Sequence, residues 1–203
     1  MITWDTLAEP LLAIVLGYLL GAIPFGLLLT RMAGLGDVRA IGSGNIGATN
    51  VLRTGRKGLA AATLLLDAAK GATAVLLARA IWPSLGLEGL AGIAAFLGHL
   101  FPVWLRFKGG KGVATMIGVV AALAWPVALA MAGIWILALL LTRYSSVGGM
   151  LAAVGAPVAA FLLGATGDIP LFAGFALLIL WTHRANVGRL VRGAEPKVGR
   201  KEA

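Results

Sequence analysis

Long apolar runs alternate with short polar segments along most of the chain. An apolar stretch of about 20 residues is the length that an α-helix needs to cross a bilayer. The pattern predicts seven helical spans, which are 7–30, 57–79, 89–105, 113–124, 127–142, 148–165 and 170–183. We expect Pro24 to kink the first span, and we divide the run 113–142 at Trp125-Pro126 because it is too long for one span.

The composition agrees with lipid as the surrounding medium. Of the 203 residues, 60% are hydrophobic and 12% are charged, whereas soluble domains average about 45–50% apolar and about 25% charged. We therefore predict an all-α integral membrane protein, a polytopic bundle of about seven helices that forms a single domain over 1–203. Since the sequence has no cysteine and its two histidines lie far apart, we expect no thiolate nucleophile, no metal site and no cofactor.

The 17 Lys and Arg residues indicate which ends of the spans face the cytoplasm. Apart from Lys70 and Arg79, they fall in the segments around the ends of the first, third, fifth and seventh spans. The positive-inside bias then places the N-terminus outside and the C-terminus in the cytoplasm. Seven spans fit this parity, and five also fit if two segments are re-entrant. Topology and phosphate contacts explain the formal charge of +9, so we expect no nucleic acid partner.

The first polar segment, 31–56, contains a glycine-rich motif from Gly42 to Asn50, followed by Arg53. It matches G-x-G-x-x-G, but a dinucleotide site would need a βαβ unit, which the pattern does not predict. Glycine N–H groups, a hydroxyl and an arginine together favour anion binding over the alternative of a flexible loop. The candidate residues of this segment are Gly42, Ser43, Gly44, Asn45, Thr49, Asn50 and Arg53.

A second polar segment leads into the predicted helix 113–124 with Gly109-Gly110-Lys111-Gly112, and Thr115 follows. At a helix start, free backbone N–H groups, the positive end of the helix dipole and an ammonium together suit a phosphate dianion. The segment is not a P-loop, because Leu105 stands where the first glycine belongs and Lys111 is not followed by Ser or Thr. The alternative is a cytoplasmic anchor with glycine spacers.

A third polar cluster follows the last predicted span. His183 and Asn186 are spaced to share one helical face, and Glu195 lies further along the tail. We favour substrate binding for the first two residues over an interfacial histidine. For Glu195 we weigh neutralisation of nearby basic residues against a plain tail charge. Ser145 and Ser146 stand at the cytoplasmic end of the fifth span, where one of them can reach the site.

Two further features lie inside the predicted spans. Asp67 and Lys70 are spaced to pair within 57–79, where a lone charge near the middle of the bilayer is costly. We favour a structural ion pair over a proton relay because no other acid joins them. Gly17 and Gly21 form a G-x-x-x-G step, which is typical of ordinary close contact between helices.

Three segments together resemble the motifs of one family. GSGNIGATNVLR, GHLFPVWLRFKGGKGVAT and HRANVGRLVRGAE are similar, in order and spacing, to those of the bacterial acyl-phosphate glycerol-3-phosphate acyltransferases. The resemblance implies a seven-helix protein of the bacterial cytoplasmic (inner) membrane, with its active site facing the cytoplasm. It also implies acyl phosphate as donor, glycerol 3-phosphate as acceptor and lysophosphatidic acid as product in phospholipid synthesis. The partners implied are membrane lipid and, functionally, the enzyme that makes acyl phosphate.

The resemblance also assigns roles to residues of this chain. It places the essential serine and arginine of the first motif on Ser43 and Arg53, and the glycine-rich acceptor loop on Gly109–Gly112. The serine after the fifth span falls on Ser146, with Ser145 left open. We assign catalysis to Ser43, Arg53, Lys111, His183 and Asn186. We assign substrate binding to Gly42, Gly44, Asn45, Thr49, Asn50, Gly109, Gly110, Gly112, Thr115, Ser146 and Glu195.

The chain departs from the acyltransferases that use an acid-supported histidine base. Trp104 and Gly188 occupy the positions that an H-x-x-x-x-D motif would give to the acid after His99 and His183. A G-x-S-x-G nucleophile elbow is also missing. We therefore expect direct attack of the glycerol hydroxyl on the acyl carbonyl, without an acyl-enzyme. A substrate phosphate oxygen or His183 would take the proton.

A transporter for an anionic solute is the main alternative to an enzyme. It would explain the spans, the Asp67–Lys70 pair and the basic segments. It predicts inverted repeats, which the sequence does not display, and polar residues along a full path across the membrane. The polar motifs cluster on one predicted face instead.

Overall fold

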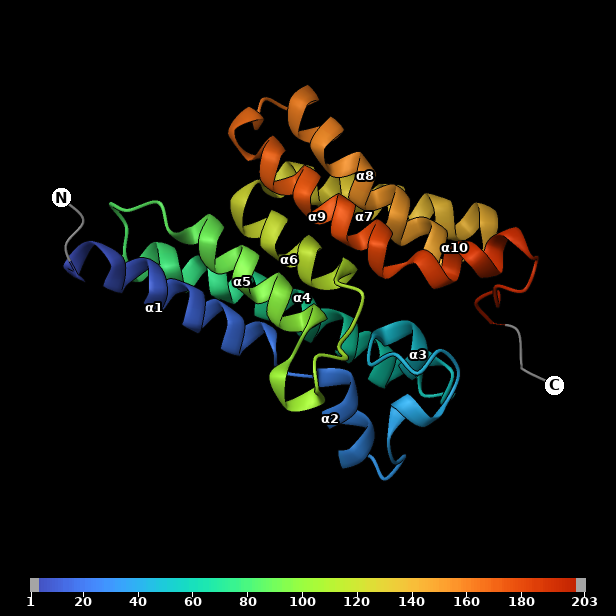
Figure 1. Ribbon diagram of the computed structural model, residues 1–203. Coiled ribbons are helices and arrows are strands. Elements are labelled where there is room, and N and C mark those ends of the chain that lie inside the picture. The colour runs from blue at the N-terminus through green and yellow to red at the C-terminus, as the bar shows by residue number, and fades with distance from the viewer. Residues whose placement is uncertain (1–3, 200–203) are drawn as a thin grey trace. The chain divides into compact units, whose positions relative to one another are not determined.

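The computed structural model describes residues 4–199, and every regular element within that range is a helix (Figure 1). The α-helices are α1 (Trp4–Gly21), α2 (Phe25–Met32), α3 (Ala48–Leu52), α4 (Lys57–Ile81), α5 (Glu88–Leu100), α6 (Val113–Leu123), α7 (Trp125–Thr142), α8 (Ser145–Leu162), α9 (Ile169–Thr182) and α10 (Arg184–Val191). Three short 3₁₀ helices join them: η1 (Val38–Ala40), η2 (Val103–Leu105) and η3 (Thr166–Asp168).

The contacts between residues divide the chain into two compact units, Met1–Leu123 and Ala124–Ala203. In the first unit, α4 lies at the centre and packs against α1, α3, α5 and α6, while α1 also packs along α5. In the second unit, α8 packs against both α7 and α9. The single domain expected over 1–203 stays a prediction.

The G-x-x-x-G step of α1 lies against α5. A Cβ atom on Gly17 would stand 2.2 Å from the carbonyl oxygen of Ala91, and one on Gly21 would stand 1.9 Å from that of Ala95. No side chain fits at either position, because the two backbones approach directly. The prediction of ordinary close contact between helices is confirmed, and α1 runs beside α5 in Figure 1.

The first predicted span is interrupted at Pro24, which is more than the expected kink. Helix α1 ends at Gly21 and α2 begins at Phe25, since proline cannot continue the helical hydrogen bonds. The carbonyl groups freed at the break are satisfied by other helices. Trp104 Nε1 donates to the oxygen of Ala22 at 2.8 Å, and Lys70 Nζ donates to that of Ile23 at 2.7 Å.

All seven predicted segments are helical in the structure, and the division of 113–142 falls at Ala124, next to the expected Trp125-Pro126. Among residues 4–199, five segments are long and apolar enough to cross a membrane: Leu7–Met32, Lys57–Ile81, Glu88–Leu105, Trp125–Thr142 and Ser145–Leu162. A sixth arises if Thr166–Thr182 and Arg184–Val191 count as one bent span. Helix α6, with 11 residues, is short of the usual length, so seven full crossings stay a prediction.

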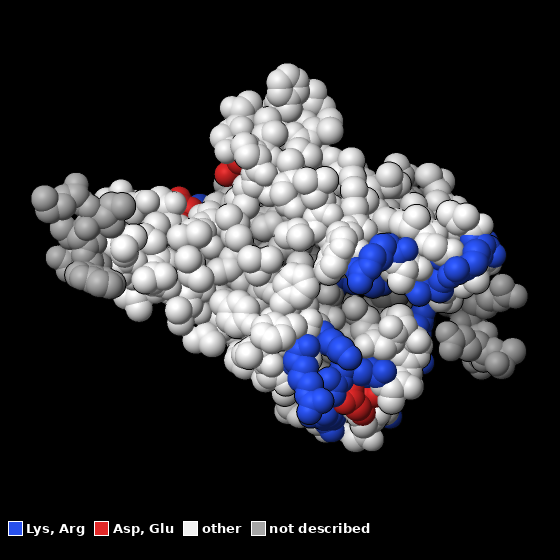
Figure 2. All heavy atoms as spheres, viewed as in Figure 1, with Lys and Arg blue, Asp and Glu red and all other residues white. Residues whose placement is uncertain are grey.

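Charged and apolar surfaces are distributed as expected for a membrane protein. Large apolar side chains such as Leu65, Leu140 and Leu141 stay exposed on the helices, where lipid would cover them. In the first unit, most of the Lys and Arg side chains visible in Figure 2 gather at the end where α2 lies. Arg200 and Lys201, which the predicted topology counts in the basic tail, lie outside the described residues.

Candidate active site

The first motif folds around one buried amide. The Oδ1 atom of Asn50 accepts hydrogen bonds from the Ser43 N–H at 3.1 Å and the Ser43 Oγ at 3.4 Å. It also accepts one from Arg53 NH1 at 3.2 Å. The structure thus brings together three of the residues that the sequence predicts for this site. They stand on the expected polar loop, but that loop contains a short helix, α3, which carries Asn50.

The other side of the same amide closes the loop. Asn50 Nδ2 donates to the carbonyl oxygens of Val38 at 2.7 Å, Ile41 at 3.1 Å and Asn45 at 2.8 Å. Asn50 is 2% exposed, and these contacts use both ends of its side chain. The geometry makes it the organiser of Ser43 and Arg53, and its predicted contact with substrate is not tested by this arrangement.

The glycines of this loop are needed by the backbone and by the arginine. Gly42 and Gly44 have φ values of +53° and +68°, a region that favours glycine. A Cβ atom on Gly42 would also stand 2.1 Å from Arg53 NH1. Ser43 and Thr49 are exposed, and Arg53 is half-buried. The hydroxyl of Ser43 and the guanidinium of Arg53 are therefore held at the surface of this loop.

An ion-pair cluster just before the motif has no counterpart among the sequence predictions. Asp37 pairs with Arg39 at 2.6 Å and with Arg31 at 3.0 Å. The hydrogen bonds from Arg39, followed by those from Arg31, hold the pKa of the Asp37 carboxyl well below its usual range, although burial opposes them. These two arginines are engaged by one carboxylate.

The second motif lies directly on the end of α5. The N–H of Gly109 donates to the carbonyl oxygen of Leu100 at 3.1 Å, and the N–H of Gly110 donates to that of His99 at 3.0 Å. The expectation that the glycine amides are free is therefore wrong for these two residues, because the carbonyl groups at the end of a helix also need donors. Lys111, half-buried, stands between them and the first turn of α6, whose N–H groups point out of the helix end.

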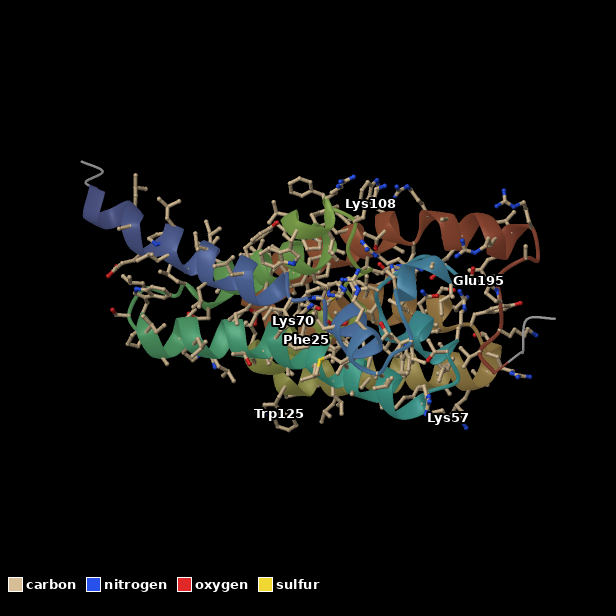
Figure 3. The ribbon with its side chains drawn as sticks, turned by 90° about the horizontal axis from the view of Figure 1, so that it is seen from below. Phe25, Lys57, Lys70, Lys108, Trp125 and Glu195 are labelled. Carbon is tan, nitrogen blue, oxygen red and sulfur yellow. The ribbon has the colours of Figure 1, made fainter. Side chains whose placement is uncertain are left out.

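Side-chain space explains why this loop is rich in glycine. A Cβ atom on Gly110 would stand 1.9 Å from His99 Nε2, and one on Gly112, whose φ is +93°, would stand 2.4 Å from Phe96 Cε2. Asn45 Nδ2 reaches the carbonyl oxygen of Gly109 at 3.5 Å and so joins the first motif to the second. Lys108, labelled in Figure 3, is exposed on the approach to this loop.

Thr115 takes a different place from the one its motif suggests. The residue is fully buried in α6, and its hydroxyl oxygen has no hydrogen-bond partner among the described residues. Thr115 packs against α4, because a Cβ atom on Gly71 of α4 would stand 2.5 Å from the carbonyl oxygen of Thr115. A contact between the Thr115 hydroxyl and substrate stays a prediction.

In the second unit, Glu195 is the centre of a hydrogen-bonded cluster (Figure 3). Its Oε1 accepts from Ser146 Oγ at 2.7 Å and from Asn186 Nδ2 at 2.6 Å. Its Oε2 accepts from Arg189 Nε at 2.7 Å. Glu195 is 9% exposed, so it is not a solvated tail charge. The contact with Glu195 favours Ser146 over Ser145 as the serine of this cluster.

The ionisation of Glu195 follows from its partners. Burial raises the pKa of the carboxyl, but the hydrogen bonds from Ser146, Asn186 and Arg189 outweigh it, and the resulting pKa is lower than usual. The group is thus an anion near neutral pH and accepts hydrogen bonds. It can orient the serine and the asparagine, but it does not hold a proton to deliver.

His183 stands at the 55° bend between α9 and α10. Its Nδ1 lies 2.8 Å from the carbonyl oxygen of Ile179. Because a carbonyl only accepts, Nδ1 carries the proton and the lone pair of the neutral ring is on Nε2. The side chain is 3% exposed. It is therefore fixed in one tautomer by its own helix, with a basic nitrogen on the other edge.

Two residues that have no role in the sequence predictions, His99 and Arg189, stand beside predicted ones. His99 lies in the second motif, and its contact with Gly110 follows from the loop folding back on α5. Arg189 lies in the third motif and contacts Glu195, and its place on α10, one turn after Asn186, is the signal that points to it. Within residues 4–199, no group of three or more His, Cys, Asp or Glu side chains could hold a metal ion.

Comparison with known proteins places the chain among enzymes of one kind. Residues 11–193 match the family model of glycerol-3-phosphate acyltransferase. The glycerol-3-phosphate acyltransferase of Mesorhizobium japonicum is 61% identical over 191 residues, which are 94% of this chain and 97% of that relative. The enzyme of the same name from Brucella anthropi is 56% identical over 189 residues, 93% of each chain.

Two crystal structures are similar to this chain over most of its length. Both are of PlsY (YgiH), an integral membrane glycerol 3-phosphate acyltransferase, one in its glycerol 3-phosphate form and the other in its lysophosphatidic acid form. Their TM-scores are 0.87 and 0.85, at 36% sequence identity, and each match covers 95% of this chain and 96% of the other.

Proposed function

Because this chain belongs to the glycerol-3-phosphate acyltransferase family, we propose that it takes its acyl group from an acyl phosphate. The enzyme is an integral multi-pass membrane protein that acylates glycerol 3-phosphate and produces lysophosphatidic acid for phospholipid synthesis. The family match is the observation that supports this reaction and argues against the transporter alternative. The donor, the residues that perform the transfer and the orientation in the membrane are the proposal.

The chemistry of the chain supports an acyl phosphate donor. There is no cysteine, and neither histidine is followed by the acid of an H-x-x-x-x-D motif. An acyl phosphate is already activated, because phosphate is a good leaving group. A site that positions the two substrates and stabilises charge then suffices for direct transfer. The resemblance of the three motifs to those of acyl-phosphate-dependent enzymes supports the same donor.

In the proposed reaction, the sn-1 hydroxyl of glycerol 3-phosphate attacks the acyl carbonyl, a new ester C–O bond forms, and the bond to phosphate breaks. The hydroxyl proton passes to a substrate phosphate oxygen or to His183 Nε2, and inorganic phosphate leaves. Two phosphorylated substrates repel each other, so cationic and N–H groups must offset their charge. Arg53, Lys111 and the first turn of α6 are the groups to which we assign that work.

The remaining contacts support roles in orientation. Asn50 holds the hydroxyl of Ser43 and the guanidinium of Arg53 in one place, which suits binding of a phosphate or of the acyl carbonyl oxygen. Glu195 holds Ser146 and Asn186, and His183 offers Nε2 at the bend of the last span. Both sets of residues serve the same reaction in this proposal.

The membrane placement follows from the basic residues. The positive-inside bias supports an N-terminus outside and a C-terminus in the cytoplasm of a bacterial inner membrane. The three motifs then face the cytoplasm, where glycerol 3-phosphate is dissolved, and the acyl chain enters from lipid. An acyl phosphate is short-lived in water, which supports a functional link to the enzyme that makes it.

The test is acyl transfer by the purified protein in lipid, with labelled glycerol 3-phosphate as acceptor. Palmitoyl phosphate, palmitoyl-CoA and palmitoyl acyl carrier protein are offered as donors in parallel reactions. We expect labelled lysophosphatidic acid from palmitoyl phosphate alone. Product from a thioester donor alone would keep the acylation of glycerol 3-phosphate and overturn the proposed donor.

A further inference from the structure

A buried polar cluster lies beneath the second motif, outside the groups that the proposed reaction uses. Helix α4 supplies Asp67 and Lys70, whose Oδ1 and Nζ atoms are 2.7 Å apart. Helix α5 supplies His99, whose Nδ1 lies 3.7 Å from the same Oδ1 of Asp67. Each of the three side chains is at most 4% exposed. The expected ion pair is present, and a histidine joins it.

The ion pair is also tied to the break in the first span. Lys70 Nζ donates to the carbonyl oxygen of Ile23 at 2.7 Å and lies 5.8 Å from the centre of the Phe25 ring (Figure 3). One ammonium thus satisfies a carboxylate and a carbonyl that the interrupted helix leaves open. Stability alone is a weak reason for such a pair, because apolar residues of similar volume often replace a buried ion pair at no loss.

The histidine connects this pair to the loop above it. The Nδ1 edge of the His99 ring faces Asp67, and the Nε2 edge lies where a Cβ atom on Gly110 would be, at 1.9 Å. The backbone of the same residue holds the loop, since the His99 carbonyl accepts the Gly110 N–H at 3.0 Å. A rotation of the ring would therefore displace Gly110 and, with it, Lys111.

Among the described residues, the Nδ1 edge of the ring is held by the carboxylate without a hydrogen bond. His99 Nδ1 has no hydrogen-bond partner there, because its distance of 3.7 Å from Asp67 Oδ1 is longer than a hydrogen bond, whereas the same Oδ1 pairs with Lys70 Nζ at 2.7 Å. With its proton on Nδ1, the ring presents a positive N–H edge to the carboxylate, and such an attraction is strong at low dielectric. The carboxylate thus sets the orientation of the ring through its charge.

We propose that Asp67, Lys70 and His99 form a positioning cluster that holds the Gly109–Gly112 loop, and with it Lys111, in the conformation that binds the phosphate of glycerol 3-phosphate. The inference rests on the proposed function and on the family resemblance, which implies that this loop is the acceptor site. The three residues act through the loop and do not touch substrate. Their loss should therefore weaken the binding of glycerol 3-phosphate and leave the binding of the acyl donor almost unchanged.

The first experiment compares two replacements of His99 in lipid. His99→Gln places an amide nitrogen near the position of Nε2, whereas His99→Leu has similar volume and no polar atom. We expect His99→Leu to raise the KM for glycerol 3-phosphate by about tenfold to a hundredfold, the size of effect that a small displacement of binding groups produces. The KM for the acyl donor should change by less than about twofold, and His99→Gln should recover part of the loss.

Stability must be separated from positioning. Val75→Ala is the matched control, because Val75 is fully buried in α4 and lies on Gly92 of α5, away from the loop. It should lower the Tm while both KM values stay within about twofold of the original. Protection against thermal unfolding by glycerol 3-phosphate gives a second readout, since at a fixed ligand concentration the rise in Tm becomes smaller as the Kd increases.

A double variant decides between a positioning cluster and a plain ion pair. Asp67→Asn alone leaves the ammonium of Lys70 without its carboxylate and should lower the Tm. Asp67→Asn with Lys70→Met removes both charges and should restore much of the Tm. Under our proposal the KM for glycerol 3-phosphate stays raised in the double variant. A double variant with the original Tm and the original KM would show an ion pair that serves the fold alone.

The outcomes also separate this inference from the proposed donor. If only a thioester supports turnover, acyl phosphate is not the donor and that part of the proposed function is wrong. The KM for glycerol 3-phosphate can then still be measured with that thioester. If His99→Leu and His99→Gln keep the original KM for glycerol 3-phosphate with any active donor, the positioning role is overturned. An equal rise in both KM values would overturn it as well.

Discussion

The polar cluster of the first motif is held by a neutral amide, whereas the cluster of the second unit is held by a carboxylate. Asn50 bonds to groups that are between 3 and 12 residues away, so its loop is built from nearby chain. Glu195 bonds to Ser146, which is 49 residues away, so its cluster depends on how α8 meets the tail. The first cluster is fixed by local backbone geometry and the second by one charge.

This difference predicts how each cluster fails. Around Asn50, six contacts share one side chain, and only one of them involves Arg53, which is half-buried. The arginine can therefore be changed without opening the loop. Around Glu195, the anion is the reason that three donors converge, so removal of the charge alone should loosen all of them.

The largest effect is expected for Arg53→Lys. The charge remains, but the planar fork that bonds Asn50 and can hold a phosphate or an oxyanion is lost. We expect kcat to fall by about a hundredfold to a thousandfold, with a Tm close to the original. Arg56→Lys is the control, since Arg56 is exposed at the end of the same loop. Equal, small effects of both changes would remove Arg53 from the reaction.

A smaller loss is expected for Glu195→Gln, which keeps the shape and removes the charge. One amide nitrogen would then face the donors that the carboxylate accepts, and Ser146 and Asn186 would lose their common acceptor. We expect kcat to fall by about tenfold, together with a loss of about 1–3 kcal/mol in the free energy of unfolding. Kinetics in lipid and thermal unfolding of the same sample measure the two quantities.

A matched change at Glu88 serves as the control for Glu195→Gln. Glu88 begins α5 and takes part in none of the described ion pairs or side-chain hydrogen bonds. Glu88→Gln should leave kcat unchanged and the free energy of unfolding within about 0.5 kcal/mol. Unchanged kcat for Glu195→Gln as well would mean that the second cluster supports the fold and not the transfer.

The sequence was informative about helices and motifs, and less so about contacts between them. Apolar run length and Trp125-Pro126 placed the helices and the break at Ala124, because both are properties of neighbouring residues. The motifs pointed to Asn50 and Glu195, but as ligands and not as the hubs that the structure displays. An amide that bonds backbone carbonyl groups leaves no periodic pattern in the sequence.

Contacts between helices explain what was missed. The approach of His99 to Asp67 depends on how α5 lies on α4, and no spacing rule links two such distant positions. The use of the Gly109 and Gly110 amides by α5 depends on the turn made by Arg106 and Phe107, both of which have positive φ. Neither residue type predicts that conformation, since positive φ is uncommon outside glycine.

A weaker effect tests the charge of Glu195 through pH. In the folded protein, burial raises the pKa of Glu195, but the hydrogen bonds from its three donors outweigh burial, so the resulting pKa is lower than usual. The unfolded chain therefore takes up a proton at higher pH, so the stabilisation is complete above the ordinary pKa and is lost as pH falls through the folded one. Glu195→Gln should flatten the decline in unfolding free energy below about pH 4.5. The pKa of Asp37 is also lowered, but its contribution is the same in both proteins and cancels. If the unfolding free energies of the two proteins fall with the same slope below this pH, the role of the Glu195 charge is contradicted.

The smallest effect is expected for Thr115→Val. This change tests the role of a residue that the motif assigns to substrate binding and that the structure buries in α6. The Thr115 hydroxyl is buried without a hydrogen bond, whereas Thr63 Oγ1, buried in α4, donates to the Leu59 carbonyl at 2.8 Å. Removal of the first hydroxyl should raise the free energy of unfolding by about 1 kcal/mol, and Thr63→Val should lower it by about as much. If the Thr115 hydroxyl binds substrate, as its motif suggests, kcat/KM will fall while stability rises. If kcat/KM stays within about twofold, Thr115 belongs to the contact between α6 and α4, and the acceptor site ends at Gly112.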